Sequence, residues 1–133
     1  MMLIVFLSLA AVQLGICFWG RFDVSRFLQT NSSLSDPAAL TSFKTLVRRN
    51  MIVAMLGLGL GLVWCLMAML MVWQFGLLGM LMVLAVAVPL FLLGKSTKKL
   101  ELQARSLPCA DPQLEAEYQH IGQSWSSKLL PDF

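Results

Sequence analysis

Apolar residues form two long runs in this chain, and the longer run, from Met51 to Gly94, has no Asp, Glu, Lys, Arg or His. An α-helix rises about 1.5 Å per residue and the hydrocarbon core of a bilayer is about 30 Å thick, so one crossing takes about 20 residues. The 44 residues of this run are enough for two crossings and a short connection. The pattern predicts two membrane-spanning helices that fold back on each other through a tight turn.

The turn is expected at residues 73–76, which read Trp-Gln-Phe-Gly. Aromatic residues favour the membrane interface, and Gln74 is the only strongly polar side chain in the run. Gly76 tolerates the backbone angles that a chain reversal requires. The spanning helices are therefore predicted at residues 50–73 and 76–94.

A third crossing is predicted at residues 1–19, an apolar run interrupted only by Ser8 and Gln13. A secretory signal would carry basic residues at its start, but no Lys or Arg precedes Arg21. The fold class that follows is an all-α membrane protein with three transmembrane helices, the second and third forming a tight hairpin. Residues 20–49 then form a loop, and residues 95–133 form a tail.

All ten Lys and Arg residues lie in the loop or after Gly94, and none lies before the first crossing or in the turn. Cations are enriched on the cytoplasmic side of membrane proteins, so the loop and the tail are predicted in the cytoplasm and the N-terminus outside. The expected location is a cell inner or plasma membrane. The cations expected to meet headgroups at its border are Arg21, Arg26, Arg48, Arg49, Lys95, Lys98 and Lys99.

The loop is expected to hold an interfacial segment followed by a helical stalk. Phe22 and its apolar neighbours are typical of a segment whose aromatic rings lie among headgroups while arginines such as Arg26 meet phosphates. Ser35 or Asp36 can then cap a helix with Pro37 in its first turn, where a missing N–H costs nothing. The stalk is predicted to continue into the second crossing.

Small residues recur along one face of the second crossing at spacings of 3, 4, 4 and 3. The predicted packing face consists of Ala54, Gly57, Gly61, Cys65 and Ala68. Close backbone approach over small residues drives helix association in lipid. The partner is either the first helix of this protein, which has a shorter stripe of Ser8, Ala11 and Gly15, or another subunit.

The tail is expected to contain an amphipathic helix over residues 112–129. Its apolar face has spacings of 4, 3, 4 and 4 and consists of Leu114, Tyr118, Ile121, Trp125 and Leu129. Glu115, Glu117 and Lys128 leave the helix mildly acidic, the wrong sign for anionic lipid. The face is therefore predicted to dock on protein, either the basic loop and stalk of this chain or a cytoplasmic partner.

The apolar runs lack the ionisable residues on which proton relays and ion-coupled carriers depend, and the one His, His120, lies in the tail. No catalytic residue, cofactor or metal site is predicted, and the protein is not expected to be an enzyme. Cys17, Cys65 and Cys109 lie in different environments and suggest no disulfide or metal pair. The net charge of +3 follows from membrane topology, so no nucleic-acid partner is expected.

Met67 and Met71 are one turn apart, and thioethers are soft ligands for Cu(I). In outline the chain resembles the copper-uptake transporters, which have three helices and a Met-x-x-x-Met in the second. Their Met- or His-rich external segments, Gly pair in the third helix and Cys/His tail are missing here. Copper transport is therefore only a minor alternative.

The function expected from these features is that of a non-enzymatic accessory or scaffold subunit of a larger membrane complex. Small-residue helix faces would pack in the bilayer, and the tail helix would dock on the cytoplasmic side. The alternative is a self-assembling pore former, because three helices with an internal basic tail resemble phage holins in outline.

Overall fold

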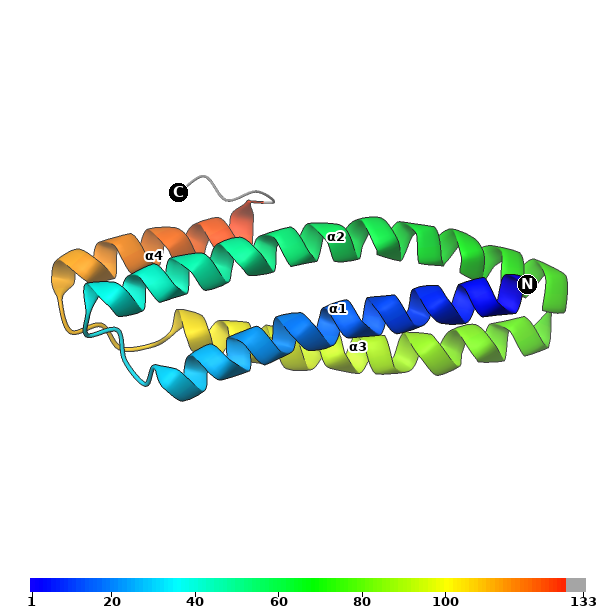
Figure 1. Cartoon of the computed structure of the whole chain (residues 1–133), viewed down its shortest axis with the longest axis horizontal. Coiled ribbons are helices and arrows are strands. Elements are labelled where there is room, and N and C mark those ends of the chain that lie inside the picture. The colour runs from blue at the N-terminus through cyan, green and yellow to red at the C-terminus, as the bar shows by residue number, and fades with distance from the viewer. Residues whose placement is uncertain (129–133) are drawn as a thin grey trace.

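The computed structural model describes residues 1–128, which form four α-helices (Figure 1). The three long helices run side by side, and α4 lies against the N-terminal part of α2. This arrangement confirms the all-α architecture with a C-terminal helix. The helices are α1 (Met2–Thr30), α2 (Pro37–Phe75), α3 (Leu77–Arg105) and α4 (Pro112–Ser127).

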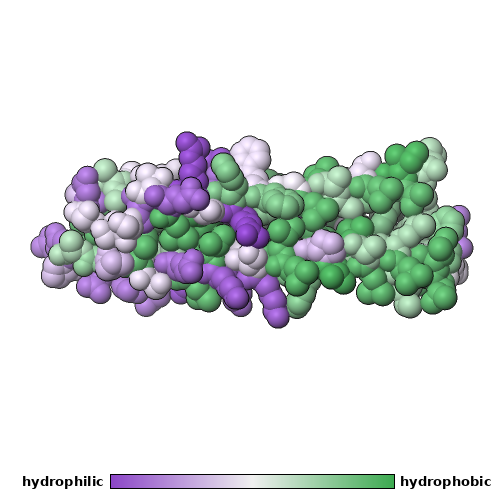
Figure 2. Space-filling view, turned by 90° about the horizontal axis from the view of Figure 1, so that it is seen from below, coloured by the Kyte–Doolittle hydropathy of each residue, from purple (hydrophilic) through white to green (hydrophobic). Residues whose placement is uncertain are grey.

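Each of the three long helices contains a stretch that is long and apolar enough to cross a membrane. Only 6% to 11% of each such stretch is buried inside the protein, so most apolar side chains face outward, as lipid contact requires. Hydrophobic residues cover one end of the molecule and hydrophilic residues gather at the other (Figure 2). This is the surface of a small multi-pass membrane protein. The hydrophilic end, residues 20–50 and 95–128, is called the polar head below.

The connection between α2 and α3 is a single residue, Gly76. Its φ of 55° and ψ of −127° lie in a region that favours glycine. Its N–H donates to the carbonyl oxygen of Val72 at 2.8 Å and so closes the last turn of α2. The predicted hairpin is confirmed, but its turn is tighter than residues 73–76, because α2 stays helical to Phe75.

The first helix does not end near Trp19 but continues to Thr30. The separate interfacial segment expected after Gly20 is therefore absent from the described structure, which continues α1 through these residues. Val24 and Phe27 are buried rather than placed among headgroups, because they are three residues apart on one side of the helix and belong to the same hydrophobic cluster. Phe22, on another side, is exposed.

The stalk begins where the sequence predicts, at Pro37, and it is continuous with the apolar part of α2. Of the two candidate caps, Asp36 is the one used, because its carboxylate accepts a hydrogen bond from the N–H of Ala38 at 3.2 Å. At the far side of the head, α3 likewise continues beyond the apolar stretch to Arg105.

The core of the polar head is built around Phe43, whose side chain is fully buried. The ring of Phe43 lies 5.7 Å from that of Phe27 in α1, 4.8 Å from that of Tyr118 and 6.0 Å from that of Trp125 in α4, measured between centroids. Ala104 adds a contact from α3. All four helices therefore contribute to one hydrophobic cluster outside the apolar end.

Candidate functional site

The small-residue face of α2 meets the first helix of the same chain at Gly57. The side-chain amide of Gln13 donates a hydrogen bond to the carbonyl oxygen of Gly57 at 3.1 Å. A Cβ atom built on Gly57 would lie 3.7 Å from both Gln13 and Ile16, and one on Gly61 would lie 4.0 Å from Gln13. The two glycines thus give Gln13 access to the backbone of α2.

The rest of this face is divided between the interior and the surface. Ala68 is buried beside Phe6 and Met71, whereas Ala54 and Cys65 are exposed. The stripe on α1 that was the candidate partner also faces outward, and nothing lies within 4 Å of a Cβ built on Gly15. At Gly57, the contact with α1 is therefore made by Gln13 and Ile16 rather than by the small residues of α1.

Gln13 is a packing residue that the spacing of small residues does not reveal. The sequence does indicate a contact at Gln13, because a strongly polar side chain in an apolar run must find a hydrogen-bond partner within the bilayer. Its Oε1 atom is buried and has no hydrogen-bond partner among residues 1–128, and the same holds for Nε1 of Trp64.

The apolar face of α4 docks on the chain's own stalk. Tyr118 and Ile121 are buried in the core of the head, and Leu114 and Trp125 pack against that core. Leu129, the last predicted member of the face, lies outside the described residues. An ion pair between Lys44 Nζ and Glu117 Oε1 at 3.9 Å adds to this contact. Docking is thus dominated by apolar burial rather than by the arginines of the loop.

The hydroxyl of Tyr118 joins α4 to the end of α3. It donates to the carbonyl oxygen of Ala104 and accepts a hydrogen bond from the N–H of Leu107 at 3.1 Å. Burial raises the pKa of Tyr118, so the hydroxyl keeps its proton at neutral pH. Two backbone groups at the end of α3 therefore depend on one side chain.

Tyr118→Phe should lower the free energy of unfolding by about 1–3 kcal/mol, because the Ala104 carbonyl and the Leu107 N–H lose their partner inside a packed region. Denaturant titration in detergent micelles measures the change. Gln119→Ala, at an exposed neighbouring position, is the control and should shift stability by less than about 0.5 kcal/mol. Equal stability of both variants would contradict the bridging role of the hydroxyl.

A compact charged group joins α1 and α2 where the apolar end meets the polar head. The Nε atom of Arg49 lies 3.1 Å from Oδ2 of Asp23, and the same oxygen accepts a hydrogen bond from Nε1 of Trp19 at 3.2 Å. The guanidinium carbon of Arg49 lies 5.5 Å from the centre of the Trp19 ring. Asp23 was not singled out from the sequence, although its i+4 spacing from Trp19 placed both on one face.

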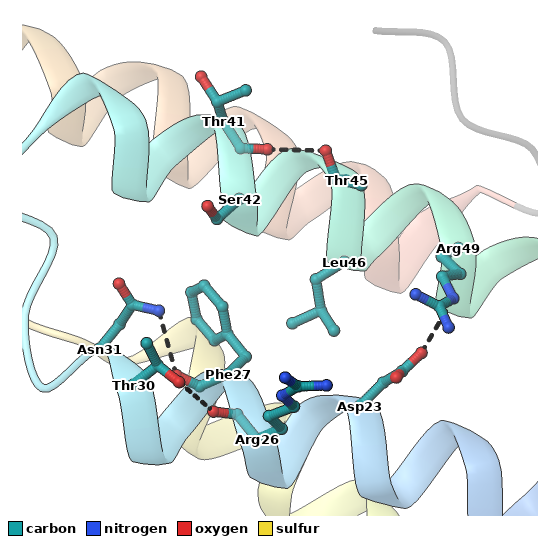
Figure 3. Close-up of a pocket in the computed structure, with 10 residues that line it drawn as sticks. All are labelled: Asp23, Arg26, Phe27, Thr30, Asn31, Thr41, Ser42, Thr45, Leu46 and Arg49. Carbon is teal, nitrogen blue, oxygen red and sulfur yellow. Dashed lines mark hydrogen bonds and ion pairs between the residues drawn. The ribbon is translucent and has the colours of Figure 1, made fainter.

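Beyond this group, α1 and α2 leave an open groove of about 400 Å³ on the surface of the head (Figure 3). The side chains of Arg26 and Arg49 both face the space between the two helices. Among the described residues, the Arg26 guanidinium makes no hydrogen bond or ion pair. The groove is lined by Asp23, Arg26, Phe27, Thr30, Asn31, Thr41, Ser42, Thr45, Leu46 and Arg49.

A second hollow, of about 450 Å³, lies next to the groove on the side of the apolar end. The two hollows share Asp23, Arg26 and Arg49, and the second adds the rings of Phe18, Trp19 and Phe22. Together they form one continuous surface that changes from aromatic to charged to hydroxyl-bearing. It is called the α1–α2 cleft below.

No protein-family model, no curated protein and no solved structure was found to match this chain.

The remaining candidate residues lie apart from the α1–α2 cleft. Met71 is fully buried in a cluster with Phe6 and Ala68, and Met67 packs against the same cluster, so both residues take part in apolar packing. The ammonium of Lys95 lies 5.3 Å from the centre of the Phe91 ring. Arg48, Lys98 and Lys99 are exposed and Arg21 is half-buried, and their place among headgroups stays a prediction.

Proposed function

We propose that this protein is a non-enzymatic accessory or scaffold subunit of a larger membrane complex. In the proposed orientation it lies in an inner or plasma membrane with the N-terminus outside and the polar head in the cytoplasm, where the head carries every Lys and Arg of the chain. Its spanning segments contain no ionisable group that could carry a proton or an ion.

The observation that carries the proposal is the open small-residue face of α1. Ser8, Ala11 and Gly15 recur at spacings of 3 and 4, and all three are exposed. A helix from another subunit can approach such a face closely and gain van der Waals contact that lipid does not offer. The corresponding face of α2 is less accessible, because Gly57 and Gly61 already lie next to Gln13.

Ala11→Leu combined with Gly15→Leu should remove the partner from a pull-down in mild detergent, because leucine side chains would hold the partner helix away from α1. Both positions are exposed, so the fold should be unaffected. Gly59→Leu is the control, since nothing lies within 4 Å of a Cβ at this position on α2. Mass spectrometry identifies the partner in the native preparation and measures its loss.

Unchanged co-purification of the α1 variant would overturn the packing face. Large homo-oligomers in the same preparation, together with loss of membrane potential on expression, would instead support the pore former. The structure favours the subunit over the pore, because Gln13, one of the few polar side chains at membrane depth, is turned towards α2 and bonded to Gly57.

A further inference from the structure

We propose that the α1–α2 cleft binds one anionic phospholipid whose headgroup carries hydroxyl groups, such as phosphatidylglycerol. Three properties of the cleft support this ligand: its charge, its hydrogen-bonding groups and its position between the apolar end and the polar head. The inference does not depend on the proposed partner, because the cleft and the small-residue face of α1 involve different residues.

The charge of the cleft matches one phosphodiester. Its ionisable side chains are two guanidinium groups and one carboxylate, which leaves a net charge of +1. Asp23 and Trp19 hold Arg49 in place, whereas Arg26 has its guanidinium donors unused by residues 1–128. Guanidinium groups bind phosphate oxygens through paired hydrogen bonds, so the phosphate belongs beside Arg26 and Arg49.

The hydroxyls of the cleft select what is attached to the phosphate. Those of Thr30, Thr41 and Thr45 donate their protons to backbone carbonyl oxygens of their own helices at 2.9 to 3.0 Å. Because each hydroxyl uses its proton within its own helix, its oxygen can only accept a hydrogen bond from a ligand. The hydroxyls of a glycerol headgroup are donors and satisfy these oxygens, whereas a choline headgroup has no donor and places a second cation next to Arg26.

The aromatic side of the cleft identifies a lipid rather than a soluble phosphate ester. Phe18, Trp19 and Phe22 are 57%, 58% and 65% exposed, and they lie between the arginines and the apolar end of the molecule. Aromatic rings at this level pack against the glycerol backbone and the first methylenes of acyl chains. The phosphate, headgroup and chains of one lipid thus meet three successive zones of the cleft.

Native mass spectrometry of the full chain, released from nanodiscs of phosphatidylglycerol and phosphatidylcholine in equal amounts, tests the proposal. The native protein should retain phosphatidylglycerol about tenfold more than phosphatidylcholine, the size expected of one charge-assisted contact. Arg26→Gln should abolish this preference without unfolding the protein, because the Arg26 side chain holds no described contact in place. Thermal melting of both proteins checks that the fold is kept.

Arg48→Gln is the matched control, because it removes the same charge from the adjacent part of α2 but lies outside the cleft. It should keep the preference. Thr45→Val tests the hydroxyl zone: it should reduce discrimination between phosphatidylglycerol and phosphatidylmethanol, an anionic lipid without headgroup hydroxyls, while leaving the preference over phosphatidylcholine.

Three results would each overturn the site. Equal retention of the two lipids by the native protein would show that the cleft does not select charge. Equal losses in Arg26→Gln and Arg48→Gln would show a general attraction to a basic surface. Displacement of the lipid by millimolar glycerophosphoglycerol would assign the cleft to a soluble phosphodiester.

Discussion

Phe43→Ala should lower the free energy of unfolding by about 3–5 kcal/mol and release α4 from the stalk. The ring of Phe43 is fully buried and contacts rings of α1 and α4, so its removal leaves a cavity at the point where these helices meet. Denaturant titration gives the stability change. Hydrogen exchange of the α4 amides shows the release, because an undocked amphipathic helix of 16 residues is marginal in water.

Phe22→Ala is the control for this prediction. It deletes the same side chain from the polar head, but Phe22 is 65% exposed and takes no part in the core cluster. Its unfolding free energy should change by less than about 0.5 kcal/mol. If Phe43→Ala kept α4 protected from exchange, the four-helix core would not be the contact that holds the tail.

The membrane architecture was predictable from the sequence because it depends on local properties. The lack of charge from Met51 to Gly94 sets the length of the hairpin, and Gly76 supplies the one left-handed residue at its turn. The apolar face of α4 was equally predictable, because Tyr118, Ile121 and Trp125 follow the 3.6-residue period of a helix.

What the sequence could not provide was the partner of each face. The same stripe at Gly57 fits α1 or another chain, and only the tertiary structure shows Gln13 against it. The same holds for α4, whose docking on Phe43 rather than on a cytoplasmic partner depends on the path of the connecting loops. Periodicity identifies a face, whereas chain geometry decides what covers it.

The end of α1 was missed for a related reason. Charge appears at Arg21, and this change from apolar to polar composition predicts the end of a helix. The helix continues because Val24 and Phe27 gain burial in a hydrophobic cluster whose other members lie far along the sequence. Composition alone also gave no sign of the ion pair between Asp23 and Arg49, because the two residues lie on different helices.

Gly79→Ala should destabilise the α2–α3 hairpin by about 1–3 kcal/mol, although alanine is the better helix former. A Cβ atom at this position would overlap the carbonyl carbon and oxygen of Met71, which are backbone atoms of the facing helix. No side-chain rotation can relieve that overlap, so α3 has to move away from α2. The tight hairpin thus requires two glycines: Gly76 for the turn, and Gly79 for the close approach of α3 to the backbone of α2.

Gly94→Ala separates this clash from helix propensity. Both glycines lie within α3, but nothing lies within 4 Å of a Cβ built on Gly94. Gly94→Ala should therefore leave the stability of the protein unchanged or raise it by up to about 1 kcal/mol, the difference in helix propensity between glycine and alanine. Gly79→Ala has the same gain in helix propensity, so the two variants differ only in the clash. Unfolding in mixed micelles with increasing dodecyl sulfate compares the two variants. If Gly79→Ala were as stable as Gly94→Ala, the helices would be farther apart near the turn, and tight packing there would not explain why the hairpin turns on one residue.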